Sequence, residues 1–286
     1  MDWQQARRLL LLTFTAVNVV LALALWLPPF SQPITQLWLG QFREREVRNQ
    51  LAAQGFRLEA PLPRAERVRP FLRVSPPAPA VIQELADRLT RLAGTGSAPG
   101  GWGAPAVLVQ PGGIVQFRPG RPWGAPVRLE NPGAVRQAAE AFLRAGGIQA
   151  VRMLRMARIY YTPAGRAVVE YVPVYEGVPV FAGYLRVFLG QEGVEEVAAF
   201  FPTPEGFRGD PKGVLDPGEA LLRLAGYLKV NPSTRGGTTF TGVELGYYAP
   251  PSVSASSWET YAAWRVLTAT GEVYYVNAFT GEVEAP

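Results

Sequence analysis

The sequence of 286 residues contains no histidine and no cysteine. Within this chain, these absences exclude Ser-His-Asp and Cys-His nucleophiles, Cys/His zinc sites and disulfides. Lysine is scarce as well, because only Lys212 and Lys229 are present, which leaves little room for Schiff-base chemistry. Carboxylate acid–base catalysis and an all-oxygen metal site are the enzymatic routes that remain. We therefore expect a binding protein that is not an enzyme and uses no cofactor and no metal.

The composition predicts a folded protein with an uneven charge distribution. Hydrophobic residues make up 48% of the chain and charged residues 18%, which is enough apolar material to build a core. Residues 28–130 carry 13 arginines against 7 acidic residues, whereas residues 131–286 carry 13 basic against 15 acidic residues. A basic region of this kind often indicates a nucleic-acid partner. The N-terminal segment argues against that partner, because it predicts export.

Residues 9–27 form an apolar run without a single charge. At 1.5 Å per residue a helix of this length spans about 28 Å, close to the roughly 30 Å hydrocarbon core of a bilayer. Arg7 and Arg8 precede the run, while residues 28–40 are uncharged, so the positive-inside rule places residues 1–8 in the cytoplasm. We expect a single-pass protein of the cell membrane whose bulk is extracytoplasmic.

A cleaved signal peptide is the alternative interpretation of this run. Ala22-Leu23-Ala24 would then be a small-x-small cleavage site behind an Arg7/Arg8 n-region. The apolar run continues for three residues beyond that site, which favours an uncleaved anchor. Under both interpretations the rest of the chain is exported.

One face of the predicted transmembrane helix carries polar and small residues. Thr15, Asn18 and Ala22 follow i, i+3, i+7 spacing and therefore share a face. Hydrogen bonds between helices and close backbone approach are the usual basis of helix association in lipid, so this stripe is a candidate partner-binding surface. The alternative is a lone asparagine that is tolerated through local hydration.

The remaining chain divides into three predicted regions. Residues 28–130 form a membrane-proximal α+β region, with a stalk helix over Ile34–Gly55 and a second helix over Ala80–Ala93. Residues 131–210 and 211–286 each open with a helix and continue as strands. The predicted fold class is α+β, with a single N-terminal transmembrane helix followed by extracytoplasmic modules of helix and antiparallel sheet.

The last two regions share a helix-start signature. Asn131-Pro132 and Asp216-Pro217 each offer an N-cap followed by proline at the first helical position. Arg186–Phe200 and Arg265–Phe279 match at several positions at a spacing of 79 residues, so we predict that they are equivalent strand pairs of a repeated module. Coincidence among common strand residues is the alternative.

A basic stretch precedes the second helix and forms a possible contact with polyanions or lipid. Its members are Arg64, Arg67, Arg69 and Arg73. Arginines at this distance from an anchor could meet anionic headgroups or wall polyanions, although a solvated or salt-paired face is the simpler interpretation.

Two other patterns carry no prediction of chemistry. Glu195-Glu196 and the pair Glu282/Glu284 are predicted to be solvated strand edges, because neighbouring strand residues point to opposite faces. Residues 94–97 and 210–213 are glycine-containing loops that lack the spacing of a phosphate-binding loop.

The opening MDWQQARRLLLLTFTAVNVVLAL resembles the start of members of the YycI family, which regulate the WalK/WalR two-component system. Three further segments are similar to that family: EVRNQLAAQGFRLEAPLP (46–63), YEGVPVF (175–181) followed by YLRVFL (184–189), and GEVYYVNAFTGEV (271–283). This sequence departs from typical members in using arginine almost to the exclusion of lysine and in its Gly/Pro loop at residues 94–126.

The resemblance implies a non-enzymatic membrane protein with PepSY-like, YycH-like modules. It would act with a YycH-type paralogue to restrain a WalK-type sensor histidine kinase that controls cell-wall metabolism, partly through transmembrane helices. No catalytic residue is carried over. The alternative is an exported PepSY-type inhibitor or folding helper of a secreted peptidase, which would not need its own anchor sequence. A wall-acting enzyme with oxygen ligands would need clustered carboxylates that we do not find in the sequence.

Overall fold

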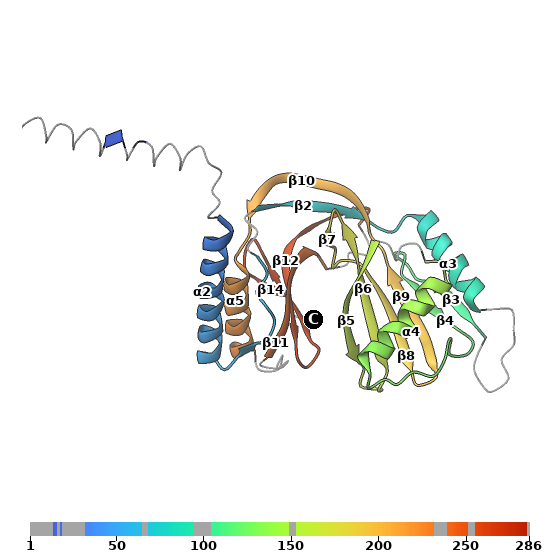
Figure 1. Ribbon diagram of the computed structural model, residues 1–286. Helices are drawn as coiled ribbons and strands as arrows, with labels where there is room; N and C mark the ends of the chain where they lie inside the picture. The colour runs from blue at the N-terminus through green and yellow to red at the C-terminus, as the bar shows by residue number, and fades with distance from the viewer. Residues whose placement is uncertain are drawn as a thin grey trace, which may run out of the picture. The chain divides into compact units, whose positions relative to one another are not determined.

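The protein has a mixed α+β fold in a computed structural model that describes residues 14, 15, 18, 32–64, 68–93, 104–148, 153–231, 239–250 and 255–284 (Figure 1). Residues 1–49 and 50–286 form two separate units, and helix α2 (Gln32–Ala53) runs from the first into the second. No helix among the described residues is long and apolar enough to cross a membrane. The predicted span at 9–27 lies outside the described residues except at 14, 15 and 18.

One seven-stranded sheet forms the middle of the second unit, with strand order β3-β4-β9-β8-β6-β5 and β7 paired to β6. Its pairings are antiparallel. Helices α3 and α4 cover one face and build a core with it (Figure 1). The bounds are α3 (Pro79–Ala93), β3 (Ala106–Val109), β4 (Val115–Arg118), α4 (Pro132–Ala145), β5 (Leu154–Tyr161), β6 (Ala167–Tyr175), β7 (Val178–Pro179), β8 (Tyr184–Gly190) and β9 (Gly193–Phe200).

The second sheet also has seven strands, with β1-β11-β12-β13-β14 as its main path and β2 joined to both β12 and β10. Helix α5 packs on β12, β13 and β14. The bounds are β1 (Arg57–Leu58), β2 (Val68–Ser75), β10 (Thr203–Gly213), α5 (Pro217–Val230), β11 (Thr239–Tyr248), β12 (Trp258–Thr268), β13 (Val273–Asn277) and β14 (Val283–Glu284). The α+β prediction is thus confirmed, and the two sheets are separate.

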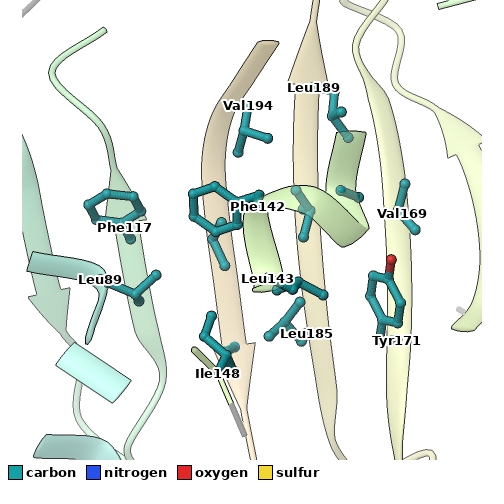
Figure 2. Packing of buried hydrophobic residues seen from close by; sticks show 14 of the residues in the cluster. Leu89, Phe117, Phe142, Leu143, Ile148, Val169, Tyr171, Leu185, Leu189 and Val194 are labelled. Carbon is teal, nitrogen blue, oxygen red and sulfur yellow. The ribbon is translucent and has the colours of Figure 1, made fainter. Parts of the chain in front are cut away.

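Helix α4 begins where the sequence predicts. The Asn131 side chain accepts hydrogen bonds from the backbone N–H of Gly133 at 2.9 Å and of Ala134 at 3.3 Å, and Pro132 occupies the first turn. Phe142 and Leu143 lie on the buried face of the helix and point onto the sheet (Figure 2). The cap therefore fixes the start of the helix that closes the first core.

Removal of the α4 cap should have a modest, measurable cost. We expect Asn131→Ala to lower the free energy of unfolding by about 1 kcal/mol, because two backbone N–H groups lose their acceptor. Urea unfolding monitored by circular dichroism measures the change. Gln137→Ala, at an exposed site on the same helix, is the control and should be nearly neutral. A cost for Asn131→Ala no larger than the control's would show that the cap is dispensable.

A helix followed by four long strands occurs twice, but not at the predicted spacing. Helices α4 and α5 begin at Pro132 and Pro217, which are 85 residues apart. The spacing of 79 residues instead pairs β8, the third long strand after α4, with β12, the second after α5. The register also differs, since Arg186 lies opposite Ala198 whereas Arg265 lies opposite Tyr275. The predicted equivalence of the two strand pairs is wrong.

Strands β2 and β10 were not predicted. They pair as an antiparallel ribbon that runs between the two sheets (Figure 1). The sequence around them contains Pro70, Pro204 and Pro211, which are unfavourable inside central strands. β10 tolerates its prolines because it pairs on one side only and carries register shifts between Pro204 and Gly206 and between Arg208 and Lys212. The boundary that we predicted between residues 210 and 211 falls inside β10.

Candidate functional site

A buried ionic cluster lies between the two sheets, on the faces that the helices leave uncovered. Val169 and Tyr171 of β6 belong to the core under α4, so Glu170 between them points to the opposite face. Trp264 of β12 donates its indole N–H to the Leu215 carbonyl before α5. Arg265 consequently points away from α5 and toward Glu170.

Glu170 is the one fully buried acidic residue in the described ranges, with 4% of its surface exposed. Arg158 Nε of β5 donates to its Oε1 at 3.2 Å, and Arg186 Nε of β8 donates to its Oε2 at 2.8 Å. Burial alone would raise the pKa of Glu170, but the charges and hydrogen bonds of Arg158 and Arg186 outweigh burial and lower this pKa. Glu170 is therefore ionised at neutral pH.

Arg265 is almost fully buried, at 2% exposure, and its guanidinium bridges the sheets. Its Nη1 lies 3.8 Å from Glu170 Oε1, and its Nη2 lies 3.5 Å from Glu244 Oε1. Nη2 also donates to the Ala157 carbonyl of β5 at 3.4 Å. Its Nε and Nη1 have no hydrogen-bond acceptor among the described residues. The cluster thus depends on charge more than on a complete hydrogen-bond set.

The rim of the cluster adds further contacts between the sheets. Arg155 Nη2 of β5 lies 2.5 Å from Glu244 Oε1 of β11, and Arg158 Nη1 donates to the Gly271 carbonyl at 2.6 Å. The guanidinium carbon of Arg158 lies 4.1 Å from the centroid of the Tyr160 ring. Four arginines and two glutamates therefore tie β5, β6 and β8 to β11 and β12.

The segment 175–181, one of those that resemble the YycI family, forms the second link between the sheets. Glu176 and Gly177 take positive φ values of 47° and 79° and turn the chain from β6 into β7. The Phe181 N–H then donates to the Tyr247 carbonyl of β11 at 2.7 Å. The Phe181 ring lies under Arg265, 4.6 Å from the guanidinium carbon.

This close approach explains a glycine in β11. A Cβ atom at Gly246 would lie 2.6 Å from the Pro179 carbonyl oxygen and 2.5 Å from the Phe181 ring. Both distances are far shorter than van der Waals contact, so only glycine lets β11 meet the 175–181 segment. The ionic cluster and this contact together join the two sheets.

The cluster is suited to holding the sheets together rather than to proton transfer. Its buried carboxylate is held ionised by two arginines and has no proton to donate near neutral pH. In the part of the chain that the structure describes, no group of three or more Asp and Glu residues lies close enough to hold a metal ion. The arrangement positions two surfaces relative to each other.

The residues of the predicted transmembrane face are only partly described. Asn18 is helical and its side-chain N–H donates to the Phe14 carbonyl at 2.8 Å, so the amide has a local partner. Thr15 is also helical, whereas Ala22 lies outside the described residues. The partner-binding role of Thr15, Asn18 and Ala22 stays a prediction.

The predicted basic stretch is divided between a loop and a strand. Arg64 is exposed, Arg67 lies outside the described residues, and Arg69 and Arg73 lie on β2. Arg73 Nε is 3.1 Å from Glu205 Oε2 of β10, and its Nη2 donates to Ser257 Oγ at 2.6 Å. Arg73 is therefore salt-paired, as the simpler interpretation has it.

The predicted solvated edge at Glu195-Glu196 is wrong. Strand β9 lies between β4 and β8, so it is a central strand. The Glu196 Oε2 atom lies 3.5 Å from both Arg118 Nε and Arg166 Nη1. The prediction failed because it considered one strand and could not include the arginines that the neighbouring strands bring to it.

Sequence reasoning also missed Glu170 and its arginines. The available signal was a glutamate in the middle of the apolar strand AVVEYVPVY (167–175). A single charge between residues that are otherwise apolar on both faces indicates a buried group with a partner. The sequence does not say which arginines supply the partner charge.

Comparisons with known proteins add little. No family model matches the sequence, and no curated protein matches it. An uncharacterized protein from Eubacterium rectale ATCC 33656, known from a crystal structure, is similar with a TM-score of 0.48 and 10% sequence identity over 80% of this chain and 90% of that chain. This likeness carries no inference about function.

Proposed function

We propose that this chain is a non-enzymatic, single-pass membrane protein of the YycI type, built from PepSY-like modules, that negatively regulates a WalK-type sensor histidine kinase with a YycH-type partner. The observation that carries the proposal is the uncharged run at residues 9–27 behind Arg7 and Arg8, within an opening that resembles the family. The segments at 46–63, 175–189 and 271–283 support it further.

The ionic cluster supports a binding role over a catalytic one. Glu170 is the best-buried carboxylate of the described residues, and a general acid would need its pKa to be raised toward neutrality. Its pKa is lowered instead, by Arg158 and Arg186. A regulator needs a defined surface, and salt-paired sheets supply one.

A membrane reconstitution tests the proposal. Full-length protein is co-purified with the candidate kinase from membranes, beside a version in which residues 9–27 are replaced by an unrelated transmembrane helix. We expect the native protein to bind the kinase and to lower its autophosphorylation, and the exchanged version to do so less. If the exchanged version inhibits equally well, or if neither binds, the kinase proposal is rejected. Binding of a secreted peptidase instead would favour the alternative function.

Within this proposal, the polar stripe of the anchor has a defined contribution. We expect Asn18→Leu to weaken kinase association in membranes by roughly 3- to 30-fold, because an intramembrane hydrogen bond is worth about 0.6–2 kcal/mol. The local bond from Asn18 to the Phe14 carbonyl favours the lower end of that range. Ala22→Phe should cost more, because it separates the helices.

The association constant is measured by titration in nanodiscs. Val20→Leu, on the opposite face of the helix, is the matched control and should change nothing. If Asn18→Leu combined with Ala22→Phe left binding and inhibition unchanged, the contact would lie outside the bilayer.

A further inference from the structure

The ribbon of β2 and β10 gathers basic residues that lie about 140 positions apart in the sequence. Arg69 of β2 lies opposite Lys212 of β10, and Phe71 lies opposite Arg208. Residues directly opposite each other in an antiparallel pair point to the same face. We call the face that carries Arg69, Phe71, Arg208 and Lys212 the basic ribbon face.

The other face of the ribbon is apolar and buried. Leu72 and Val74 of β2 are fully buried and pack with Phe207 of β10. Because side chains alternate along a strand, this burial directs Arg69, Phe71 and Arg208 outward. The basic ribbon face is thus set by the packing of the strands.

Its charges are incompletely neutralised. Arg208 and Lys212 are exposed, and neither forms an ion pair with a carboxylate in the described ranges. The Lys212 ammonium lies 4.7 Å from the centroid of the Phe71 ring, which holds it over an aromatic surface. Asp210, in the irregular part of β10, is the acidic residue nearest in sequence and is also exposed. The face therefore keeps a positive excess beside an aromatic ring.

We propose that the basic ribbon face contacts the phosphate headgroups of anionic membrane lipids. Cations beside a partly buried aromatic ring match a headgroup surface in charge and polarity. Val68, at the end of β2, exposes 55% of its surface and adds an apolar side chain at the same end of the ribbon. The proposal rests on the membrane anchorage proposed above, which confines the chain to a lipid surface.

The absence of native cysteine permits a direct test. A single cysteine at Gly213→Cys carries a fluorophore at the end of the ribbon. A Cβ there meets no atom within 4 Å, and Gly213 does not have a positive φ. The labelled full-length chain is placed in nanodiscs of zwitterionic lipid or of lipid containing phosphatidylglycerol, each with a headgroup-linked quencher. We expect stronger quenching in the anionic discs and a loss of that difference at high salt.

Removal of the three cations should abolish the difference. Each basic residue near an anionic surface contributes about 1 kcal/mol, or roughly five-fold, so Arg69→Gln, Arg208→Gln and Lys212→Gln together should shift the docking equilibrium by about 100-fold. The control combines Arg91→Gln, Arg128→Gln and Arg144→Gln, which lowers the net charge equally at exposed sites elsewhere. The control should keep the quenching.

Every outcome decides the proposal. Equal quenching in both lipids, or quenching that survives the ribbon variant, overturns it. Reversal of the quenching by a soluble phosphodiester polymer would make such a polymer the partner and would also overturn it. If the chain is not retained in nanodiscs, anchorage fails, and co-sedimentation of the full-length protein with phosphatidylglycerol vesicles then tests the ribbon separately.

Discussion

Replacement of Glu170 by alanine should lower the free energy of unfolding by about 3–5 kcal/mol. Removing the carboxylate leaves the nearly fully buried Arg265 and the largely buried Arg158 without their shared counter-charge. Loss of one partner of a buried pair is costly because the remaining charge stays desolvated. Urea unfolding followed by circular dichroism measures the change.

Two comparisons separate this effect from general fragility. Glu219→Ala removes one partner of the exposed pair with Arg223 on α5, and it should cost no more than about 0.5 kcal/mol. The double variant Glu170→Leu, Arg265→Leu should be more stable than Glu170→Ala, because apolar groups of similar volume can replace a buried pair. If the double variant is less stable than Glu170→Ala, charge burial is not the cause.

The pH dependence of this effect has a defined sign. The pKa of Glu170 is lowered from 4.5 in the folded protein, so the unfolded chain takes up the proton first as the pH falls. The stabilisation by ionised Glu170 is therefore complete above about pH 4.5 and is lost as the pH falls through the lowered pKa. The stability difference between the wild type and Glu170→Gln should narrow over that range.

Phe142→Ala should also cost about 3–5 kcal/mol, through a cavity in the first core. The ring is fully buried, lies 5.3 Å from the Trp123 ring at an edge-on angle and 6.2 Å from the Phe117 ring, and faces the sheet near Val194 (Figure 2). Neither a helix nor a central sheet can collapse easily to fill the space that the ring leaves.

Thermal and urea unfolding should both report the loss at Phe142. Phe142→Leu keeps most of the apolar volume and should cost clearly less than alanine. Leu108→Ala, at a side chain that is 55% exposed, is the surface control. Equal losses for Phe142→Ala and Leu108→Ala would show that the first core does not depend on this ring.

The local parts of the fold were predictable from the sequence. Helices α3, α4 and α5 lie where apolar spacing and the Asn131 and Asp216 caps indicate, because those signals act within a few residues. Strands β2 and β10 were missed because each contains prolines and finds its partner more than a hundred residues away.

The candidate site was less predictable than the helices. Arg158, Arg186 and Arg265 occupy alternate positions of strands, where sequence alone indicates a solvated face. They became buried partners of Glu170 only because two sheets oppose each other. That opposition depends on the 175–181 segment and Gly246, which no local pattern reveals.

The ribbon of β2 and β10 has a consequence for the order of folding. Ser75 and Thr203 are register partners, and the whole of the first sheet lies in sequence between them. The first sheet is thus an insertion into the second, and its strands are complete at residue 200. Strand β2 must instead wait for β10 and for β12, which ends at residue 268. During synthesis the inserted domain can close first, while the domain that receives it stays open almost to the end of the chain.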